Sequence, residues 1–299
     1  MTSRGWQRIV WTVVACLFTL SAALGGSPRV ALDEALQAKV MVVMRGRPGA
    51  VIVYDIDHRE VRAVTDATLA FRALRPPGSL MKLVSALALY DARARVVPCA
   101  DRYDVGGRVL TCGFEGGHGR VDLRQAIARS CCVWFHAVGA SLDVAALFDA
   151  ARRCGIGVPS PFPAGASARL RAPRTATERA LARVGEGGWV QITPWDAVSL
   201  VVSLREARDP AGSFVYAAMR DTVTQGTARA AGVDGVDVRG KTGTATWLEP
   251  ARADAAPRTH GWFAGTAGRL AIVVFLQQGT GRDAAAIAGR VLRQCREAL

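Results

Sequence analysis

Strand-forming segments stand at both ends of this 299-residue chain, and helix-forming segments fill its middle. Residues 50–55 (AVIVYD) and 60–64 (EVRAV) are β-branched runs joined by a polar turn, which predicts a hairpin. The C-terminal third predicts strands at residues 236–246, 261–266 and 270–277 and a closing helix at 284–299. Because both groups of strands must bury a face, we expect an α/β fold in which both termini complete one sheet around an inserted helical region.

The helical region is expected from about residue 79 to 205, between sheet parts at about 45–70 and 230–299. Apolar residues recur at helical spacing in residues 80–90, 122–135 and 142–151. A further helix is predicted to open at Thr193, with Thr193 as N-cap, Pro194 in the first helical position and Asp196 as an acid in the first turn.

The N-terminus has the pattern of an export segment. Arg4 and Arg8 precede the almost wholly apolar residues 9–24, a run that is short for a membrane span and fits a signal peptide. Small residues follow, which favours cleavage, whereas Trp6 and Trp11 would suit a membrane interface. We therefore interpret residues 1–26 as a signal peptide or membrane anchor and residues 27–299 as the exported part. The expected location is periplasmic or extracytoplasmic, with anchoring in the inner membrane left open.

The seven cysteines suit an oxidising compartment, and Cys16 lies in the export segment. Sequence alone does not choose among the pairings of the other six. Cys99 and Cys112 flank a turn-rich stretch, so they are the predicted disulfide. No CxxC occurs and the histidines are scattered, so we expect neither a metal site nor a cofactor. The histidines are His58, His118, His136 and His260.

The formal charge of +13 comes almost entirely from arginine, since only three of the 38 basic residues are lysine. The arginines are spread along the chain, which argues against a nucleic-acid-binding stripe. A generally basic surface would attract anionic envelope polymers or lipids, although a coding bias toward arginine explains the composition equally well.

Ser79 and Lys82 form the first candidate for chemistry. Residues three apart share a helix face, so the hydroxyl and the amine lie one above the other. A neutral amine beside a serine can remove the proton from this weak nucleophile. The pattern S-x-x-K is common by chance, and a serine N-cap beside a lysine that reaches to solvent is the alternative.

The second candidate is the run Lys241, Thr242, Gly243 and Thr244 on a predicted strand. Gly243 would let another backbone approach the strand closely. The amine and the hydroxyls suit a carboxylate ligand, whereas a tight turn with an exposed lysine is the alternative. Two of the three lysines fall within these two patterns.

Ser130, Cys131 and Cys132 lie between these motifs, and the three together resemble S-x-x-K, S-x-N and K-T-G of penicillin-binding proteins and serine β-lactamases. The chain resembles a penicillin-binding protein transpeptidase domain over about residues 50–292. The other similar stretches are residues 75–79 (RPPGS), 118–119 (HG), 122–123 (DL), 126–131 (AIARSC), 187–194 (GGWVQITP) and 261–265 (GWFAG). This resemblance implies a serine β-lactamase/DD-peptidase-like fold with an antiparallel sheet and flanking helices.

The resemblance also implies roles. Ser79 would be the nucleophile and Lys82 its base, Ser130 would relay a proton to the leaving amine, and Lys241 would hold Ser130 and the substrate carboxylate. Thr242, Gly243, Thr244 and Cys132 would contact substrate, and the amides of Ser79 and Thr244 would form the oxyanion hole. The implied substrates are peptidoglycan stem peptides ending in D-Ala-D-Ala, with β-lactams as mimics that acylate Ser79. The implied activity is that of a D,D-transpeptidase or carboxypeptidase.

Cys132 departs from the family pattern, which has Asn or Asp at this position. A thiol is a weaker hydrogen-bonding partner for the lysine or the substrate. A class D-like β-lactamase or β-lactam sensor therefore remains an alternative, as does a catalytically weak peptidoglycan-binding or scaffold module. Glu178 precedes a leucine as in class A β-lactamases, but the Asn of that motif is missing. A lone acyl-transfer domain would need a glycosyltransferase or morphogenetic partner.

Overall fold

The computed structural model describes residues 27–247 and 258–296. The predicted export segment, residues 1–26, lies outside the described residues. Within the described ranges, no single helix is both long and apolar enough to cross a membrane. Two shorter helical stretches, Cys132–Ser141 and Val144–Arg153, reach that length only together and are bent by 116° at their junction.

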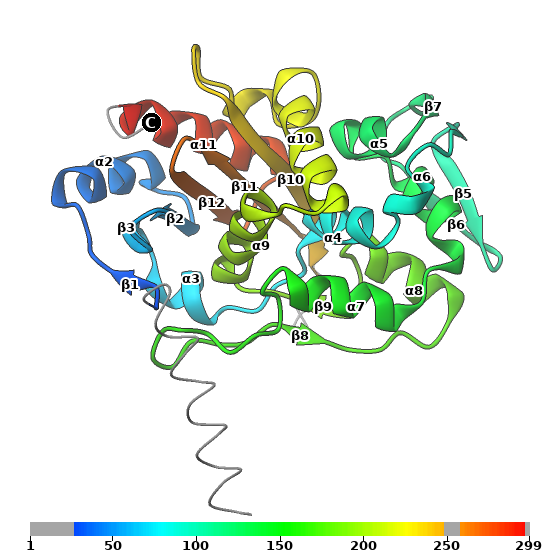
Figure 1. Cartoon of the computed structure of the whole chain (residues 1–299), viewed down its shortest axis with the longest axis horizontal. Coiled ribbons are helices and arrows are strands. Elements are labelled where there is room, and N and C mark those ends of the chain that lie inside the picture. The colour runs from blue at the N-terminus through cyan, green and yellow to red at the C-terminus, as the bar shows by residue number, and fades with distance from the viewer. Residues whose placement is uncertain (1–26, 248–257, 297–299) are drawn as a thin grey trace, which may run out of the picture.

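One six-stranded sheet joins the two ends of the chain (Figure 1). Its strands, in spatial order, are β1 (Arg29–Val30), β3 (Glu60–Val64), β2 (Gly49–Asp55), β12 (Leu270–Leu276), β11 (Arg258–Ala267) and β10 (Val238–Trp247). All neighbours are antiparallel except β1 and β3. The hairpin and the three C-terminal strands are therefore confirmed, and the β2–β12 ladder closes the sheet between the termini as expected.

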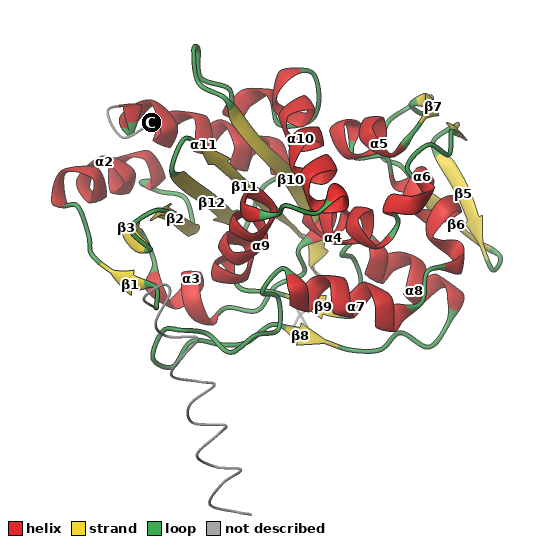
Figure 2. Cartoon of the chain, in the orientation of Figure 1, coloured by secondary structure: helices red, strands yellow, loops and turns green. Residues whose placement is uncertain are grey.

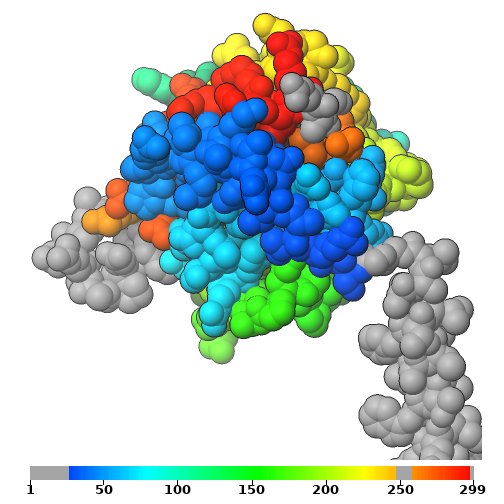
Figure 3. Space-filling model, turned by 90° about the vertical axis from the view of Figure 1, so that its left-hand side faces the viewer, coloured from blue at the N-terminus to red at the C-terminus, as the bar shows by residue number. Residues whose placement is uncertain are grey.

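Helices cover both faces of the sheet. Successive strand residues point to opposite sides, so neighbouring residues of one strand pack into different cores. In β2, Val51 and Val53 join a core with α2 (Glu34–Met44) and α11 (Gly281–Gln294), whereas Ile52 and Tyr54 join a second core with α9 (Pro194–Glu206). Figure 3 shows the N-terminal residues in blue packed against the C-terminal helix in red.

The helical region lies on the face opposite α2 and α11 (Figure 2). The helices not yet named are α3 (Ala67–Arg72), η1 (Gly78–Leu80), α4 (Met81–Ala88), η2 (Tyr90–Ala92), α5 (Leu123–Arg129), α6 (Cys132–Val138), η3 (Gly139–Ser141), α7 (Val144–Arg153), α8 (Ala176–Arg183), α10 (Pro210–Thr224) and η4 (Arg229–Ala231). Of these, η4 packs against α11 on the other side of the sheet. Three short pairs accompany them: β4 (Val97–Cys99) with β7 (Gly119–Val121), β5 (Arg102–Val105) with β6 (Arg108–Thr111), and β8 (Arg169–Leu170) with β9 (Val190–Gln191).

The predicted start of α9 is confirmed, but the single helix predicted over residues 122–135 is wrong. Thr193 caps α9 through the backbone N–H of Asp196, with Pro194 in the first helical position. In place of one long helix, α5 and α6 are separated at Ser130, whose φ of 59° and ψ of 38° are left-handed. A left-handed residue cannot continue an α-helix, so the chain turns here.

Candidate functional site

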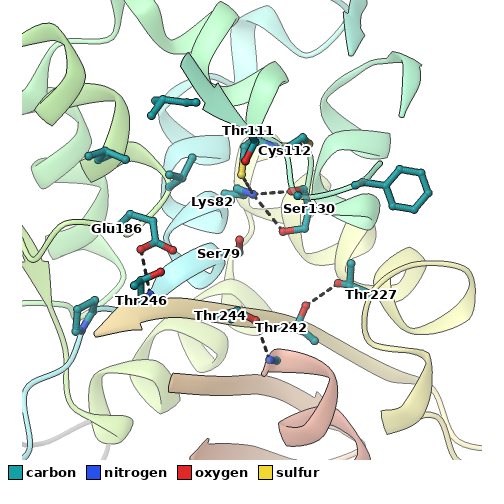
Figure 4. Close-up of a pocket in the computed structure, with 18 of the residues that line it drawn as sticks. Ser79, Lys82, Thr111, Cys112, Ser130, Glu186, Thr227, Thr242, Thr244 and Thr246 are labelled. Carbon is teal, nitrogen blue, oxygen red and sulfur yellow. Dashed lines mark hydrogen bonds between the residues drawn. The ribbon is translucent and has the colours of Figure 1, made fainter. Parts of the chain in front are cut away.

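A cleft of about 1120 Å³ opens where η1 and α4 meet the edge strand β10 (Figure 4). The predicted site residues that line it are Ser79, Lys82, Ser130, Cys132, Thr242 and Thr244. They come from three segments more than 40 residues apart in the sequence. The structure thus brings the three sequence motifs to one place.

Ser79 lies in η1, and Lys82 follows in the first turn of α4. Figure 4 shows the Ser79 hydroxyl between Lys82 and the threonines of β10. Ser79 is half-buried, so its hydroxyl remains accessible from the cleft, whereas Lys82 is fully buried. The lysine therefore does not reach to solvent beside a serine N-cap, which was the alternative from the sequence.

The Lys82 amine is held by the second motif. Its Nζ donates to the Ser130 carbonyl oxygen at 2.6 Å, to Ser130 Oγ at 3.2 Å and to Cys132 Sγ at 3.0 Å. The left-handed backbone of Ser130 makes the first two contacts possible, because it turns both the carbonyl and the hydroxyl of one residue toward the amine. Non-glycine residues in this conformation cost energy and cluster at functional sites.

Lys241 approaches the same hydroxyl from β10. It is fully buried, and its Nζ donates to Ser130 Oγ at 3.0 Å and to the Thr242 carbonyl oxygen at 3.0 Å. Burial, followed by repulsion from Lys82, lowers the pKa of Lys241 well below its usual range. The Ser130 hydroxyl therefore lies between two buried amines and can exchange protons with either one.

Cys132 takes the position where the family that the sequence resembles has Asn or Asp, and its thiol does contact the lysine. Its hydrogen bond with Cys112 and its burial raise the pKa of the Cys132 thiol above the ordinary value. The group therefore stays a protonated thiol at neutral pH, which argues against a second nucleophile.

Glycines allow η1 and β10 to pack backbone to backbone. A Cβ at Gly243 would collide with the Pro77 carbonyl oxygen, and a Cβ at Gly78 would lie 2.5 Å from the Thr244 carbonyl oxygen. The predicted close approach at Gly243 is confirmed. It sets the distance between the helix that carries Ser79 and the strand that carries the threonines.

The β10 threonines are positioned by their neighbours. Thr242 Oγ1 lies 2.6 Å from Thr227 Oγ1, and Thr244 Oγ1 accepts a hydrogen bond of 2.9 Å from the Gly281 amide at the start of α11. In the described sheet β10 pairs only with β11, so its other edge faces the cleft.

Several cleft residues were missed from the sequence. Glu186 is the one carboxylate among the described residues that line the cleft. Its Oε2 accepts a hydrogen bond from the Thr246 amide at 3.3 Å, and burial raises the pKa of Glu186 to about 7. Burial also lowers the pKa of His136 to about 3. Three arginines, Arg108, Arg129 and Arg282, line the cleft as well. Glu186 adjoins the glycine-rich stretch before Thr193, which was its only signal in the sequence.

Glu178 does not line the cleft. Its carboxylate caps α8, where it accepts the backbone N–H groups of Arg174 at 2.6 Å and Thr175 at 3.2 Å. It is thus a helix-capping residue, and the class A motif, which lacked its Asn in the sequence, does not reach the cleft.

The cysteine assignments from the sequence need correction. Cys99 and Cys112 are free in the structure and form no disulfide. The chain instead carries both sulfurs to His118 Nδ1, at 3.5 and 3.2 Å, and Cys131 joins them. These four residues have ligand atoms within 4.8 Å of one another, although they are scattered in the sequence, so the expectation of no metal site does not follow from that scatter.

Known structures share this architecture. The D,D-transpeptidase domain of a peptidoglycan glycosyltransferase from Eggerthella lenta aligns with a TM-score of 0.77 at 20% identity, over 90% of this chain and 82% of that chain. The transpeptidase domain of penicillin-binding protein 3 from Burkholderia pseudomallei aligns at 0.76 and 19% identity, over 89% and 95%. PBP2 of Helicobacter pylori, in a complex with MreC, aligns at 0.80 and 17% identity, over 90% of this chain but 63% of its own. The expected fold class is confirmed.

A search of curated proteins gave no significant match. The family model described as the penicillin binding protein transpeptidase domain matches residues 41–206 and 213–296, which is most of the chain. The protein therefore belongs to the penicillin-binding protein transpeptidase family.

Proposed function

We propose that this chain is an exported active-serine D,D-transpeptidase that acts on peptidoglycan stem peptides ending in D-Ala-D-Ala and is acylated at Ser79 by β-lactams. Residues 27–299 would form the acyl-transfer unit behind an export segment. The observation that carries the proposal is the convergence of the Lys82 and Lys241 amines on the Ser130 hydroxyl, beside an accessible Ser79.

In the first step, the Lys82 amine acts as the base and takes the proton of Ser79 as the hydroxyl oxygen attacks the carbonyl carbon of the penultimate D-Ala. The developing oxyanion would accept hydrogen bonds from the backbone N–H groups of Ser79 and Thr244. The Thr246 amide points to the cleft edge of β10, where it meets Glu186. Alternate strand residues direct their N–H groups to the same edge, so the Thr244 amide also faces the cleft.

In the second step, the C–N bond breaks and the leaving amine of the terminal D-Ala needs a proton. Ser130 Oγ lies within 3.2 Å of Lys82 Nζ and 3.0 Å of Lys241 Nζ. The proton taken by Lys82 would pass through the Ser130 hydroxyl to the amine, and Lys241 would stabilise the hydroxyl during the transfer. Lys82 has then passed on the proton that it took, and Ser79 carries the acyl group.

The surroundings of the cleft suit an anionic, extended peptide. The terminal carboxylate would bind the Thr242 and Thr244 hydroxyls near Lys241, and Arg282, which also lines the cleft, follows Gly281, whose amide bonds Thr244. The unpaired edge of β10 could accept the peptide as an added strand.

A second candidate, carboxypeptidase activity, is favoured by Glu186. A carboxyl group whose pKa is about 7 can act as a general base near neutral pH. Positioned in the cleft, it could activate water to release the acyl group by hydrolysis. The same group would serve the β-lactamase alternative if hydrolysis of penicillin were fast.

For partners, H. pylori PBP2 offers a precedent, since its structure is a complex with MreC. We propose that this chain likewise works with a morphogenetic or glycosyltransferase partner on the outer side of the inner membrane. The basic composition would favour anionic envelope polymers nearby.

Fluorescent penicillin tests the proposal on the purified full chain. Wild type should form a stable covalent adduct, Ser79→Ala should not label, and Lys82→Ala should label much more slowly. Ser85→Ala is the matched control, because Ser85 is a buried serine of α4, the helix that carries Lys82, and its hydroxyl donates to the Arg183 carbonyl oxygen.

Absence of label on wild type would overturn the active-serine proposal and leave a binding or scaffold module. Label that disappears within seconds would identify a β-lactamase. If the adduct is stable, D-Ala release from a stem peptide is measured with and without an amine acceptor, which separates a carboxypeptidase from a transpeptidase. A stable adduct without D-Ala release would indicate a sensor.

Cys132→Asn should accelerate acylation. An amide oxygen accepts a hydrogen bond from Lys82 better than a thiol, and the amide N–H₂ can donate to substrate. An added hydrogen bond contributes about 1 kcal/mol, so a severalfold increase in the labelling rate is expected. An unchanged or slower rate would show that the thiol does not limit acylation.

A further inference from the structure

Exposed apolar side chains are concentrated in the first elements that the structure describes. Among the described residues, eight large apolar side chains are exposed, and four of them lie between residues 30 and 42. These four are Val30, Leu32, Met41 and Val42. Figure 3 shows the segment that carries them, in the darker blues, together on one side of the molecule. We call the exposed side of residues 29–47 the N-terminal face. A contiguous apolar surface of this kind marks an interaction site.

Helix α2 is apolar on both of its sides. Val40, Val43 and Met44 point into the core that it shares with α11. The side that faces away from this core carries more apolar residues, all exposed: Ala35, Ala38, Met41 and Val42. A helix that is apolar all round is normally buried all round. Among the described residues nothing covers the outer side of α2, so we expect a partner there.

Basic side chains surround this outer side. The exposed ones are Lys39, Arg45 and Arg47 on and just after α2, and Arg290 and Arg293 on α11 beside it. None of the five forms an ion pair with another described residue. Glu34, in the first turn, is the one acid of α2. Apolar residues with basic neighbours are typical of a helix that lies on an anionic membrane surface.

A groove of about 330 Å³ opens where α2 ends. Met41 and Met44 give it apolar walls, and Arg45 and Arg47 line it as well. Its one described carboxylate, Asp66, already accepts a backbone N–H as the N-cap of α3. Two arginines beside a methionine wall suit a ligand with a phosphate and an apolar tail, which is the chemistry of a phospholipid.

The sheet places the catalytic cleft far from this face. Strand β1 is one edge of the sheet and β10 is the other, with four strands between them. Neighbouring strands are about 4.8 Å apart, so the two edges are separated by about 24 Å. A flat surface under the N-terminal face would therefore leave the cleft along β10 open to a polymer on the other side.

The sequence before this face points to the membrane. Residues 9–24 are almost wholly apolar, and the proposed export segment ends at residue 26. Eight residues connect residue 26 to Glu34, where α2 begins, and they can span at most about 28 Å. The N-terminal face is thus the first part of the folded chain behind a segment that brings the chain to the membrane.

We propose that the N-terminal face lies on the outer surface of the inner membrane and binds anionic phospholipids. Met41 and Val42 enter the boundary between headgroups and acyl chains, and Arg45 and Arg47 bind headgroup phosphates. The cleft then faces away from the membrane, toward peptidoglycan. This inference rests on the proposed function only for the export of the chain.

Quenching of an added tryptophan by brominated lipids tests the contact, with the full chain reconstituted into vesicles. Val42→Trp places the reporter on the face. Val109→Trp, on β6 at the cleft, is the matched control, because both valines are more than half exposed. Subtraction of the wild-type signal removes the native tryptophans. With brominated phosphatidylcholine and phosphatidylglycerol, the added emission of Val42→Trp should fall by at least about half, and that of Val109→Trp should not change.

Charge reversal tests the role of the anionic lipid. Arg45→Glu with Arg47→Glu, introduced into the Val42→Trp chain, should restore the emission, as should vesicles of brominated phosphatidylcholine alone. Arg169→Glu with Arg171→Glu is the matched control, because these exposed arginines have the same spacing at β8, and it should leave the quenching intact.

An added emission of Val42→Trp that brominated lipids do not quench would overturn the proposal, and so would quenching that survives the reversal at Arg45 and Arg47. A lipid-free dimer that Val42→Glu dissociates would also overturn it, because a second copy would then cover the face. Penicillin labelling reports on the proposed function separately. All these variants should label at the wild-type rate, and a wild type that is quenched but not labelled would contradict the acyl-transfer proposal alone.

Discussion

Ser130 shows how one residue can organise a site. Its left-handed backbone ends α5 and presents a carbonyl and a hydroxyl to Lys82, and the same hydroxyl meets Lys241. A proton should pass through this hydroxyl more easily between two buried amines than between two solvated ammonium groups. The reason is that burial favours the neutral form of Lys241, which can accept a proton.

Glu186 is the residue whose charge should control stability near neutral pH. Its pKa is raised from 4.5 to about 7, so the folded state binds this proton more tightly than the unfolded state does. The free energy of unfolding should therefore fall as pH rises from about 4.5 through about 7, by up to about 3 kcal/mol. Glu186→Gln should remove this loss, so that the variant is more stable than wild type at pH 8 and about equal at pH 4, as measured by urea unfolding.

Glu178→Gln is the control with the opposite sign. Backbone N–H groups of Arg174 and Thr175 lower the pKa of Glu178, so its contribution is present above its ordinary pKa and is lost as pH falls. If both variants followed wild type at every pH, the carboxylate of Glu186 would be solvated rather than buried.

At the scale of elements, the contact between η1 and β10 sets the width of the cleft. Gly243 has no room for a methyl group because the Pro77 carbonyl oxygen occupies that place. Gly243→Ala should push Ser79 away from Thr244, cost about 2 kcal/mol of unfolding free energy and slow penicillin labelling. Gly232→Ala is the control, since its new methyl group would meet only the Arg229 carbonyl oxygen at 3.2 Å and Val223 at 3.8 Å, with φ at −61°. Equal stability and labelling of the two variants would contradict this account.

Elements with a local signal were predictable, and those fixed by tertiary contacts were not. Alternation predicted the β2–β3 hairpin, and Thr193 with Pro194 predicted the start of α9. The break at Ser130 has no propensity signal, because apolar spacing continues through it, and it depends on the contacts with Lys82 and Lys241. Helix α2 went unpredicted, since its apolar residues form no clean stripe and its place is set by packing on α11.

The residues of the candidate active site could be identified from the sequence, whereas the cysteine and histidine cluster beside it could not. Ser79, Lys82 and Lys241 stood out because lysine is scarce and each lies in a short motif. By contrast, Cys99, Cys112, His118 and Cys131 have irregular spacing, and only the folding of residues 97–121 against α6 brings them together. Glu186 was missed for a similar reason. Its raised pKa depends on burial, which the glycine-rich sequence around it does not show.

At the scale of the whole molecule, the two cores share the strands that separate them. Ile272 and Val274 of β12 belong to the core with α11, and Val273 and Phe275 of the same strand belong to the core with α9. Neither core can lose its packing while the strands stay ordered, so the described chain should unfold as one cooperative unit.

Thiol labelling can measure this cooperativity with two probes of equal burial. Cys154 follows α7 in one core and Cys295 follows α11 in the other, and each is 4% exposed. In rising urea, both should become reactive at the same midpoint, with loss of helical circular dichroism at that midpoint too. Earlier exposure of Cys154 than of Cys295 would mean that the helical region unfolds on its own, and the shared strands would then not couple the two cores. Single variants Cys154→Ala and Cys295→Ala assign each signal, because each removes one probe and leaves the other core untouched.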